Sequence, residues 1–134
     1  MSIKGEILIV DDEQSILDLL GRILELGDFS VRPATSGQAA LQTTQAALPD
    51  LILLDLAMPV MDGFETCRRL KANPATKDVP VIFLTGQGEI EKVVQGFELG
   101  AVDYITKPFN TTELLRRVST HIELYQLQRS LSRE

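Results

Sequence analysis

The 134-residue sequence has little of several features that would narrow its class. It contains a single cysteine, Cys67, and so cannot form an internal disulfide, which indicates a reducing compartment. Its apolar runs fall far short of the roughly 18 residues that a membrane-spanning helix needs. The short apolar stretch near the N-terminus lacks the pattern of a signal peptide. We therefore expect a soluble, cytoplasmic domain with no membrane partner.

Basic residues are the scarcer charged group. The chain has 13 Lys and Arg residues against 19 Asp and Glu residues, a net charge of −6. An acidic domain is poorly suited to bind a phosphate backbone, so we expect no nucleic-acid partner for this domain. The length and a hydrophobic content of 44% are sufficient for one domain with its own core.

Uninterrupted apolar runs are present, and each ends in a polar residue. They cover residues 7–10, 51–54 and 81–84. Continuous rather than alternating runs are typical of strands that are buried on both faces of a parallel sheet. Two weaker segments, 29–35 and 101–108, complete a set of five strands. Pro33 places the first of these at a sheet edge, because proline cannot donate to a central ladder.

Helical spacing separates the strands. Gly27 ends a first helix, Ser36 can cap a second that runs to about residue 47, and Asn110 with Glu113 can open the fifth. The apolar positions that indicate helices are Ile16, Leu19, Leu20, Ile23 and Leu24 in the first, Phe64, Cys67 and Leu70 in the third, Ile90, Val93, Val94 and Phe97 in the fourth, and Leu115, Val118, Ile122 and Tyr125 in the fifth. Five alternations predict an α/β fold, a five-stranded parallel sheet with helices on both faces.

Polar residues follow four of the predicted strands: Asp11 and Asp12, then Asp55, Thr85 and Lys107. The carboxyl ends of parallel strands meet at one edge of a sheet, where ligands bind. We therefore expect these five side chains to converge. Because an ionised carboxylate is costly to bury, we expect Asp55 to face solvent at the mouth of the core.

Three crowded carboxylates need a cation. Two carboxylates ~4 Å apart repel by about 4 kcal/mol at an effective dielectric constant near 20, and crowding raises their pKa values. An all-oxygen site with few protein ligands suits Mg²⁺. Three carboxylates, one divalent ion and Lys107 sum to zero charge. Such a site can hold a phosphoryl group on the metal, Lys107 and Thr85, with Asp55 as the accepting nucleophile.

Four segments together resemble a known family. They are IVDDE at 9–13, LLDLAMPVMDGFE at 53–65, FLTG at 83–86 and GAVDYITKPF at 100–109. In this order the sequence resembles the receiver domain of bacterial two-component response regulators over roughly residues 5–122. The resemblance implies a flavodoxin-like strand order, 2-1-3-4-5. It also implies a phosphorylation-controlled signalling switch that is not an enzyme toward other molecules, and a sensor histidine kinase or phosphotransfer protein as partner.

The resemblance also assigns a Mg²⁺ site. Asp12 and Asp55 match the direct carboxylate ligands, and the backbone carbonyl of Ala57 matches a third ligand. Asp11 matches a residue that usually acts through water. Mg²⁺ is the only cofactor that the resemblance implies.

The resemblance also assigns the residues that bind the phosphoryl group and the residue that responds to it. Asp55 matches the phosphoacceptor, and Lys107 and Thr85 match the residues that contact phosphoryl oxygens. Tyr104 matches an aromatic switch residue that turns inward when Thr85 is drawn toward the phosphate. The Lys107–Pro108 bond is usually cis in this family.

Two other function classes compete with this interpretation. Haloacid-dehalogenase-type phosphatases also form an aspartyl phosphate, but they carry a second acid two residues after the nucleophile, where this chain has Ala57. A phosphate-independent scaffold of receiver fold is the third class. The joint presence of the acids with Thr85 and Lys107 argues against it.

The C-terminal segment has a second apolar stripe. Leu124, Leu127 and Leu131 are offset by one residue, roughly 100° around a helix, from the stripe that packs the fifth helix on the sheet. We expect residues 1–123 to form the receiver domain and residues 124–134 a helical extension. The extension is either a frayed helix end, a linker to an output module outside this chain, or a contact in a homodimer.

Overall fold

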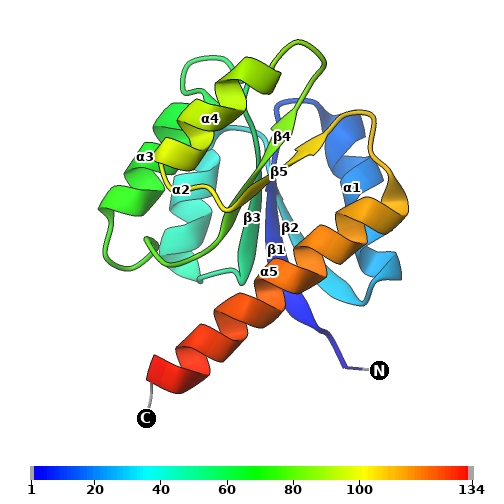
Figure 1. The fold of residues 1–134 in the computed structure, drawn as a ribbon, viewed down its shortest axis with the longest axis vertical. Coiled ribbons are helices and arrows are strands. Elements are labelled where there is room, and N and C mark those ends of the chain that lie inside the picture. The colour runs from blue at the N-terminus through cyan, green and yellow to red at the C-terminus, as the bar shows by residue number, and fades with distance from the viewer. Residues whose placement is uncertain (1, 133–134) are drawn as a thin grey trace.

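The computed structural model describes residues 2–132, in which strands and helices alternate along the chain (Figure 1). The strands are β1 (Gly5–Val10), β2 (Phe29–Ala34), β3 (Leu51–Asp55), β4 (Val81–Thr85) and β5 (Asp103–Thr106). The helices are α1 (Gln14–Leu26), α2 (Gly37–Ala46), α3 (Gly63–Ala72), α4 (Ile90–Glu98) and α5 (Thr111–Ser132). All strand pairs are parallel, in the order β2-β1-β3-β4-β5, so the predicted fold class and strand order are confirmed.

The apolar runs form the centre of the sheet. Residues 7–10, 51–54 and 81–84 are all buried, because helices cover both faces of strands β1, β3 and β4. Strand β2, which contains Pro33, lies at the edge as expected. Strand β5 is shorter than the predicted 101–108. Its start is delayed because the Ala101 amide donates to the Gly96 carbonyl at the end of α4.

Two apolar layers enclose the sheet. Figure 1 shows α1 and α5 against one face and α2, α3 and α4 against the other. Alternate residues of each central strand supply the two core clusters; Ile7 and Leu53 face α1 and α5, whereas Leu8 and Leu54 face the opposite layer. Helix α5 crosses the sheet at an angle, so Tyr125 near its end joins the second cluster.

The predicted caps are present. Ser36 accepts a hydrogen bond from the Ala39 amide at 3.0 Å, and Asn110 accepts one from the Glu113 amide at 2.9 Å. Gly27 ends α1. The Glu113 carboxylate pairs with Arg117 at 3.1 Å, one turn further along α5.

Two helices present a core face that is shifted from the predicted one. In α1, Leu19 is exposed and Leu17 is buried instead; in α5, Leu114 is buried and Leu115 only half-buried. Successive helix residues are about 100° apart, so an error of one or two residues in the stripe moves a side chain from the core to its rim or to solvent. The helices themselves are placed correctly.

Helix α4 departs furthest from a core-facing pattern. Ile90, Val94 and Phe97 are exposed, and Gly96 is the buried residue of the helix. A Cβ atom at Gly96 would lie 2.7 Å from the Phe83 ring. The backbone of α4 therefore approaches β4 at this glycine, and most of its apolar side chains point outward.

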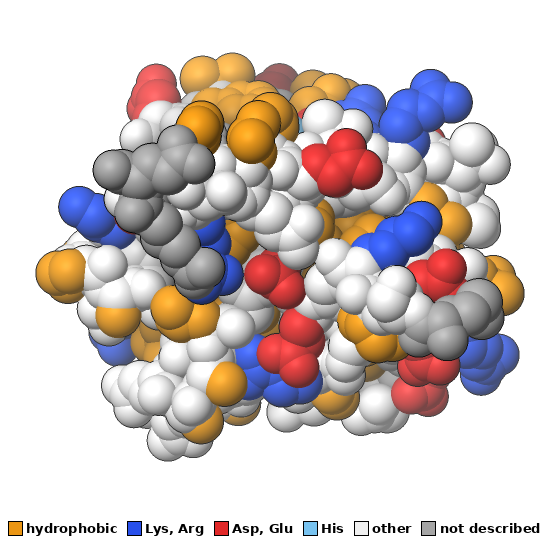
Figure 2. Space-filling model, turned by 90° about the horizontal axis from the view of Figure 1, so that it is seen from below, with side chains coloured by type: hydrophobic (Ala, Val, Ile, Leu, Met, Phe, Trp, Pro, Cys, Tyr) orange, Lys and Arg blue, Asp and Glu red, His pale blue; other side chains and the backbone are white. Residues whose placement is uncertain are grey.

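Helix α5 runs unbroken through Ser132, so the predicted boundary between residues 123 and 124 falls inside one helix. Gln126 donates to the Lys4 carbonyl at 3.2 Å, which attaches this part of the helix to the residue directly before β1. Among residues 2–132 no helix is long and apolar enough to cross a membrane. The face from which the chain ends emerge carries interspersed acidic, basic and apolar side chains (Figure 2).

Candidate functional site

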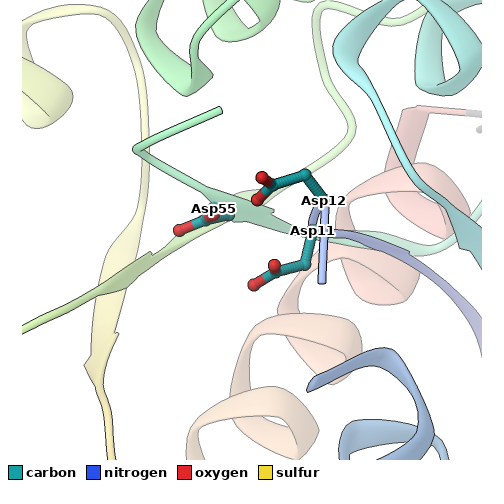
Figure 3. Close-up of side chains that lie close together, drawn as sticks. All are labelled: Asp11, Asp12 and Asp55. Atoms are coloured by element: carbon teal, nitrogen blue, oxygen red, sulfur yellow. The ribbon is translucent and has the colours of Figure 1, made fainter. Parts of the chain in front are cut away.

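The predicted site residues gather at the carboxyl edge of the sheet. Asp55 is the last residue of β3, Thr85 is the last residue of β4, and Asp11 follows β1 directly. Figure 3 shows the carboxylates of Asp11, Asp12 and Asp55 projecting toward the same side from the ends of β1 and β3. One carboxylate oxygen from each lies within 4.8 Å of the others. The structure thus brings Asp55 together with two adjacent acids that precede it by more than forty residues in the sequence.

Lys107 joins two of these acids. Its Nζ lies 3.0 Å from Asp11 Oδ2 and 3.3 Å from Asp55 Oδ1. Asp11 Oδ1 accepts a hydrogen bond from the Glu13 amide at 2.9 Å. Both Asp11 oxygens therefore have protein partners, whereas Asp12 is exposed.

The expectation that Asp55 faces solvent is wrong. Its exposed fraction is only 4%, and Asp11 is completely buried. Helix α3 covers the strand end, because Gly63 lets its backbone approach the Asp55 carbonyl. Asp12 is the exposed member of the three acids. Access to the cluster is therefore from the side of Asp12.

The environment of Asp55 favours its protonated form. Burial, and next the neighbouring Asp11 charge, raise the pKa of Asp55 from 3.8 to about 6, against the lowering effect of Lys107 and of a hydrogen bond from the Ala57 backbone. Burial alone would lower the pKa of Lys107. Its hydrogen bond to Asp11 and the charges of both acids raise that pKa above its usual value. The site therefore holds excess negative charge that a cation would neutralise.

Thr85 presents an unused hydroxyl. Its side chain is completely buried, and Oγ1 has no hydrogen-bond partner within residues 2–132. The neighbouring residue Leu84 is opposite Asp55 in the register of β3 and β4. A buried hydroxyl without a partner is costly. Its position beside the acids fits a role as donor to a ligand oxygen.

Tyr104 lies outside the acid cluster. It is opposite Phe83 on the neighbouring strand, two residues before Thr85, and it is half-buried. Its ring meets Phe97 of α4 edge to face with centroids 6.3 Å apart, and the Arg117 guanidinium of α5 lies 5.7 Å from its centroid. Tyr104 therefore links α4, β5 and α5.

Gly63, the first residue of α3, is a site residue for which no role was predicted. A Cβ at Gly63 would lie 2.3 Å from the Asp55 carbonyl oxygen, so only glycine fits there without backbone movement. The signal in the sequence is a glycine at the start of a helix that directly follows the acid-bearing loop. At the opposite side of the site, the Lys107–Pro108 peptide bond is cis.

The fold and site define a class: a doubly wound α/β domain with an acidic, lysine-bridged cluster beside an unused threonine hydroxyl. The family model of the response regulator receiver domain matches residues 7–119. The chain belongs to this family, whose members are phosphorylation-controlled signalling switches of two-component systems.

Several known proteins are similar to the chain. The DNA-binding dual master transcriptional regulator RpaA of Synechocystis sp. is 45% identical over 112 residues, which are 84% of this chain and 46% of RpaA. A probable cyclic di-GMP phosphodiesterase of Vibrio cholerae is 43% identical over 117 residues, 87% of this chain and 26% of that protein. A solved response regulator from Chloroflexus aurantiacus superposes with a TM-score of 0.85 at 39% identity, covering 89% of this chain and 98% of that one.

The two curated relatives are longer than this chain, and the similarity covers only part of their length. The chain spans about half or less of the length of the curated relatives, and they differ in the activity named for the whole protein. The shared part is the receiver domain. Nothing in the comparisons supports the phosphatase alternative.

Proposed function

We propose that Asp55 accepts a phosphoryl group from the phosphohistidine of a sensor histidine kinase or phosphotransfer protein. The observation that carries this proposal is the arrangement of Asp55, Lys107 and Thr85. The Asp55 carboxylate lies 3.3 Å from the Lys107 ammonium group, next to a buried hydroxyl that has no hydrogen-bond partner within residues 2–132. A phosphoryl group brings the acceptor oxygens that both donors need. Phosphoryl transfer requires mainly positioning and charge neutralisation.

The donor set fits Mg²⁺. Three carboxylates within one site and a raised Asp55 pKa indicate uncompensated negative charge. Asp12, Asp55 and the Ala57 carbonyl would ligate the ion directly. Asp11, whose oxygens already bind Lys107 and the Glu13 amide, would act through water. When bound, the ion neutralises charge on the carboxylates and the phosphoryl oxygens.

The reaction forms an acyl phosphate. An Asp55 carboxylate oxygen attacks phosphorus, the bond between phosphorus and the donor imidazole nitrogen breaks, and the electron pair stays on that nitrogen. Lys107 leaves its carboxylate partners in part to contact a phosphoryl oxygen. Thr85 donates its hydroxyl to another. Hydrolysis later restores Asp55, so the domain promotes only its own phosphorylation and dephosphorylation.

The readout passes through Tyr104. Thr85 lies two register positions beyond Phe83, the residue opposite Tyr104, so a movement of Thr85 toward the phosphoryl group changes the space beside the ring. Tyr104 contacts α4 and α5, and this surface would then change for a partner or output. We propose a cytoplasmic location for this exchange with the kinase, and no nucleic-acid contact by this domain.

The proposal is tested by intact mass after incubation with acetyl phosphate, with and without Mg²⁺. Wild type is expected to gain one phosphoryl group only with Mg²⁺, and Asp55→Asn none. Asp18→Asn is the matched control, because Asp18 is an exposed acid on α1 outside the cluster. It is expected to behave as wild type.

Two results would contradict the proposal. An adduct on Asp55→Asn would place the acceptor elsewhere. Failure of wild type to form an adduct and to bind beryllofluoride with Mg²⁺ would favour the phosphate-independent scaffold.

We further propose that the end of α5 contacts a second copy of the chain. Leu124, Leu127 and Leu131 are 49%, 56% and 61% exposed, and their 3-4 spacing is that of a heptad seam. Of the positions that flank the seam, Gln128 and Ser130 are uncharged and Glu123 is acidic, so in a parallel pair Glu123 of one chain faces the uncharged Gln128 of the other. A homodimer would cover all three leucines of each chain.

Leu127→Lys is expected to weaken this dimer by at least about tenfold, because it removes a leucine that the dimer would bury and introduces a charge. Sedimentation equilibrium over a range of concentrations measures the effect. Ser132→Lys adds the same charge at an exposed position outside the seam and its flanking positions, and is expected to change association much less. Equal behaviour of the two variants, or a wild type that stays monomeric at every concentration and with beryllofluoride, would refute the contact.

A further inference from the structure

A carboxylate that does not belong to the acid cluster accepts a hydrogen bond from a backbone amide next to the cluster. Glu89 Oε1 accepts a hydrogen bond from the Gly86 amide at 2.7 Å. Gly86 directly follows Thr85, and Glu89 immediately precedes α4. The Glu89 side chain makes no capping bond to α4, so its carboxylate is directed back toward the strand end.

The ladder geometry indicates which way the Gly86 amide points. The Leu84 carbonyl accepts from Leu56 on the β3 side, whereas the Thr85 carbonyl accepts from Lys107 on the β5 side. Backbone groups of successive strand residues alternate between the two neighbours. The Gly86 amide therefore points toward β3, the strand that ends in Asp55.

Within residues 2–132, that amide has no partner in the sheet ladder. The next acceptor on this side is the Leu56 carbonyl, but it accepts from the Gly63 amide at 2.9 Å. The sheet thus ends with a backbone donor next to Thr85, on the side of Asp55, and Glu89 is the group that satisfies it. A Cβ at Gly86 would lie 3.1 Å from Glu89 Oε1, so glycine also permits this close approach.

We infer that Glu89 is an internal competitor of the incoming phosphoryl group. The inference rests on the proposed function. The Gly86 amide can donate to a phosphoryl oxygen on Asp55 only after the Glu89 carboxylate has left it. While Glu89 stays in place, its negative charge also opposes the approach of an anion. Glu89 is a positioning residue that favours the unphosphorylated state. Its carboxylate is released directly before α4, and α4 belongs to the surface proposed for readout.

The test compares Glu89→Ala and Glu89→Gln with Glu91→Ala. Glu91 lies in the first turn of α4 and carries the same charge, but it has no contact with Gly86 among the hydrogen bonds of residues 2–132. With Mg²⁺ present, Glu89→Ala is expected to bind beryllofluoride about tenfold more tightly than wild type, because a charge-assisted hydrogen bond no longer has to be broken. Glu89→Gln keeps an acceptor without charge, so its affinity for beryllofluoride is expected to fall between those of Glu89→Ala and wild type. The affinity of Glu91→Ala is expected to match that of wild type closely.

A second readout needs neither Mg²⁺ nor a phosphoryl analogue. In the resting protein, the Gly86 amide proton is expected to shift upfield in the NMR spectrum of Glu89→Ala but not of Glu91→Ala, because a hydrogen bond to a carboxylate is lost. Equal beryllofluoride affinities for Glu89→Ala and Glu91→Ala, or an unshifted amide, would overturn the inference alone. Absence of beryllofluoride binding by wild type and all variants would overturn the proposed function and the inference with it.

Discussion

Metal-free Asp55→Asn protein is expected to be more stable than wild type at about pH 7.5, by about 3 kcal/mol. The cause is the charge of Asp55, which is buried beside Asp11 so that its pKa rises from 3.8 to about 6. Each unit of pKa shift corresponds to about 1.4 kcal/mol, so a shift of roughly two units gives this value. Asparagine has nearly the same shape and carries no charge to desolvate.

The pH dependence of this effect has a definite sign. Folded Asp55 binds its proton more tightly than unfolded Asp55, so the free energy of unfolding of wild type falls as the pH rises from about 4 through about 6. The advantage of Asp55→Asn is therefore expected to be small below about pH 4 and to reach its full size above about pH 6. The chain has no tryptophan, so urea unfolding is best followed by far-UV circular dichroism.

Mg²⁺ is expected to remove the difference. At about 100 times its Kd, a ligand of the folded state adds about 2.7 kcal/mol, and Asp55→Asn lacks one of the proposed ligands. Asp18→Asn controls for the loss of one negative charge and is expected to stay close to wild type. If Asp55→Asn were no more stable than Asp18→Asn at about pH 7.5 without metal, the buried-charge explanation would be wrong.

Much of the fold is contained in local sequence patterns. The apolar runs at 7–10, 51–54 and 81–84 give central strands, because a strand inside a parallel sheet is covered by helices on both faces and buries every consecutive side chain. Pro33 gives an edge strand for a stereochemical reason that does not depend on context. Caps such as Ser36 act within four residues and are equally readable.

Which face of a helix packs on the sheet is harder to predict from the sequence. Leu17 and Leu19 are chemically alike, and which of them reaches the core is decided by the rotation of α1 on the sheet. The apolar spacing of α4 predicts a core stripe, yet Val94 and Phe97 are largely exposed because Gly96 brings the helix backbone against Phe83. Apolar spacing alone does not distinguish a stripe that packs on the core from one that faces solvent.

The candidate site also has features that the sequence predicts and features that it does not. The convergence of Asp11, Asp55 and Lys107 follows from parallel topology and strand ends, and it was predictable. The burial of Asp55 was not, because it depends on how closely α3 packs over the end of β3. The bond from Gly86 to Glu89 depends on the conformation of one short turn.

Gly63→Ala is expected to lower the free energy of unfolding by about 3 kcal/mol, because the position allows no side chain. A Cβ would lie 2.3 Å from the Asp55 carbonyl oxygen and 2.8 Å from Leu56 Cα, so the strand end and α3 must separate. The same movement displaces Asp55 from its partners. Misplacement of a reacting group by about 1 Å costs on the order of a hundredfold in rate, and phosphorylation by acetyl phosphate is expected to slow accordingly.

Gly21→Ala is the matched control for Gly63→Ala. In the part of the chain that the structure describes, no atom lies within 4 Å of a Cβ built at Gly21. Gly21 lies inside α1, so alanine there is expected to stabilise the protein by about 1 kcal/mol. The two substitutions add the same methyl group to a helix, with opposite signs expected in urea unfolding. If both stabilised the protein and left the phosphorylation rate unchanged, the close approach of α3 to Asp55 would not be what positions the acceptor. If only Gly63→Ala destabilised and slowed the reaction, the backbone contact beneath Asp55 would be a direct determinant of its chemistry.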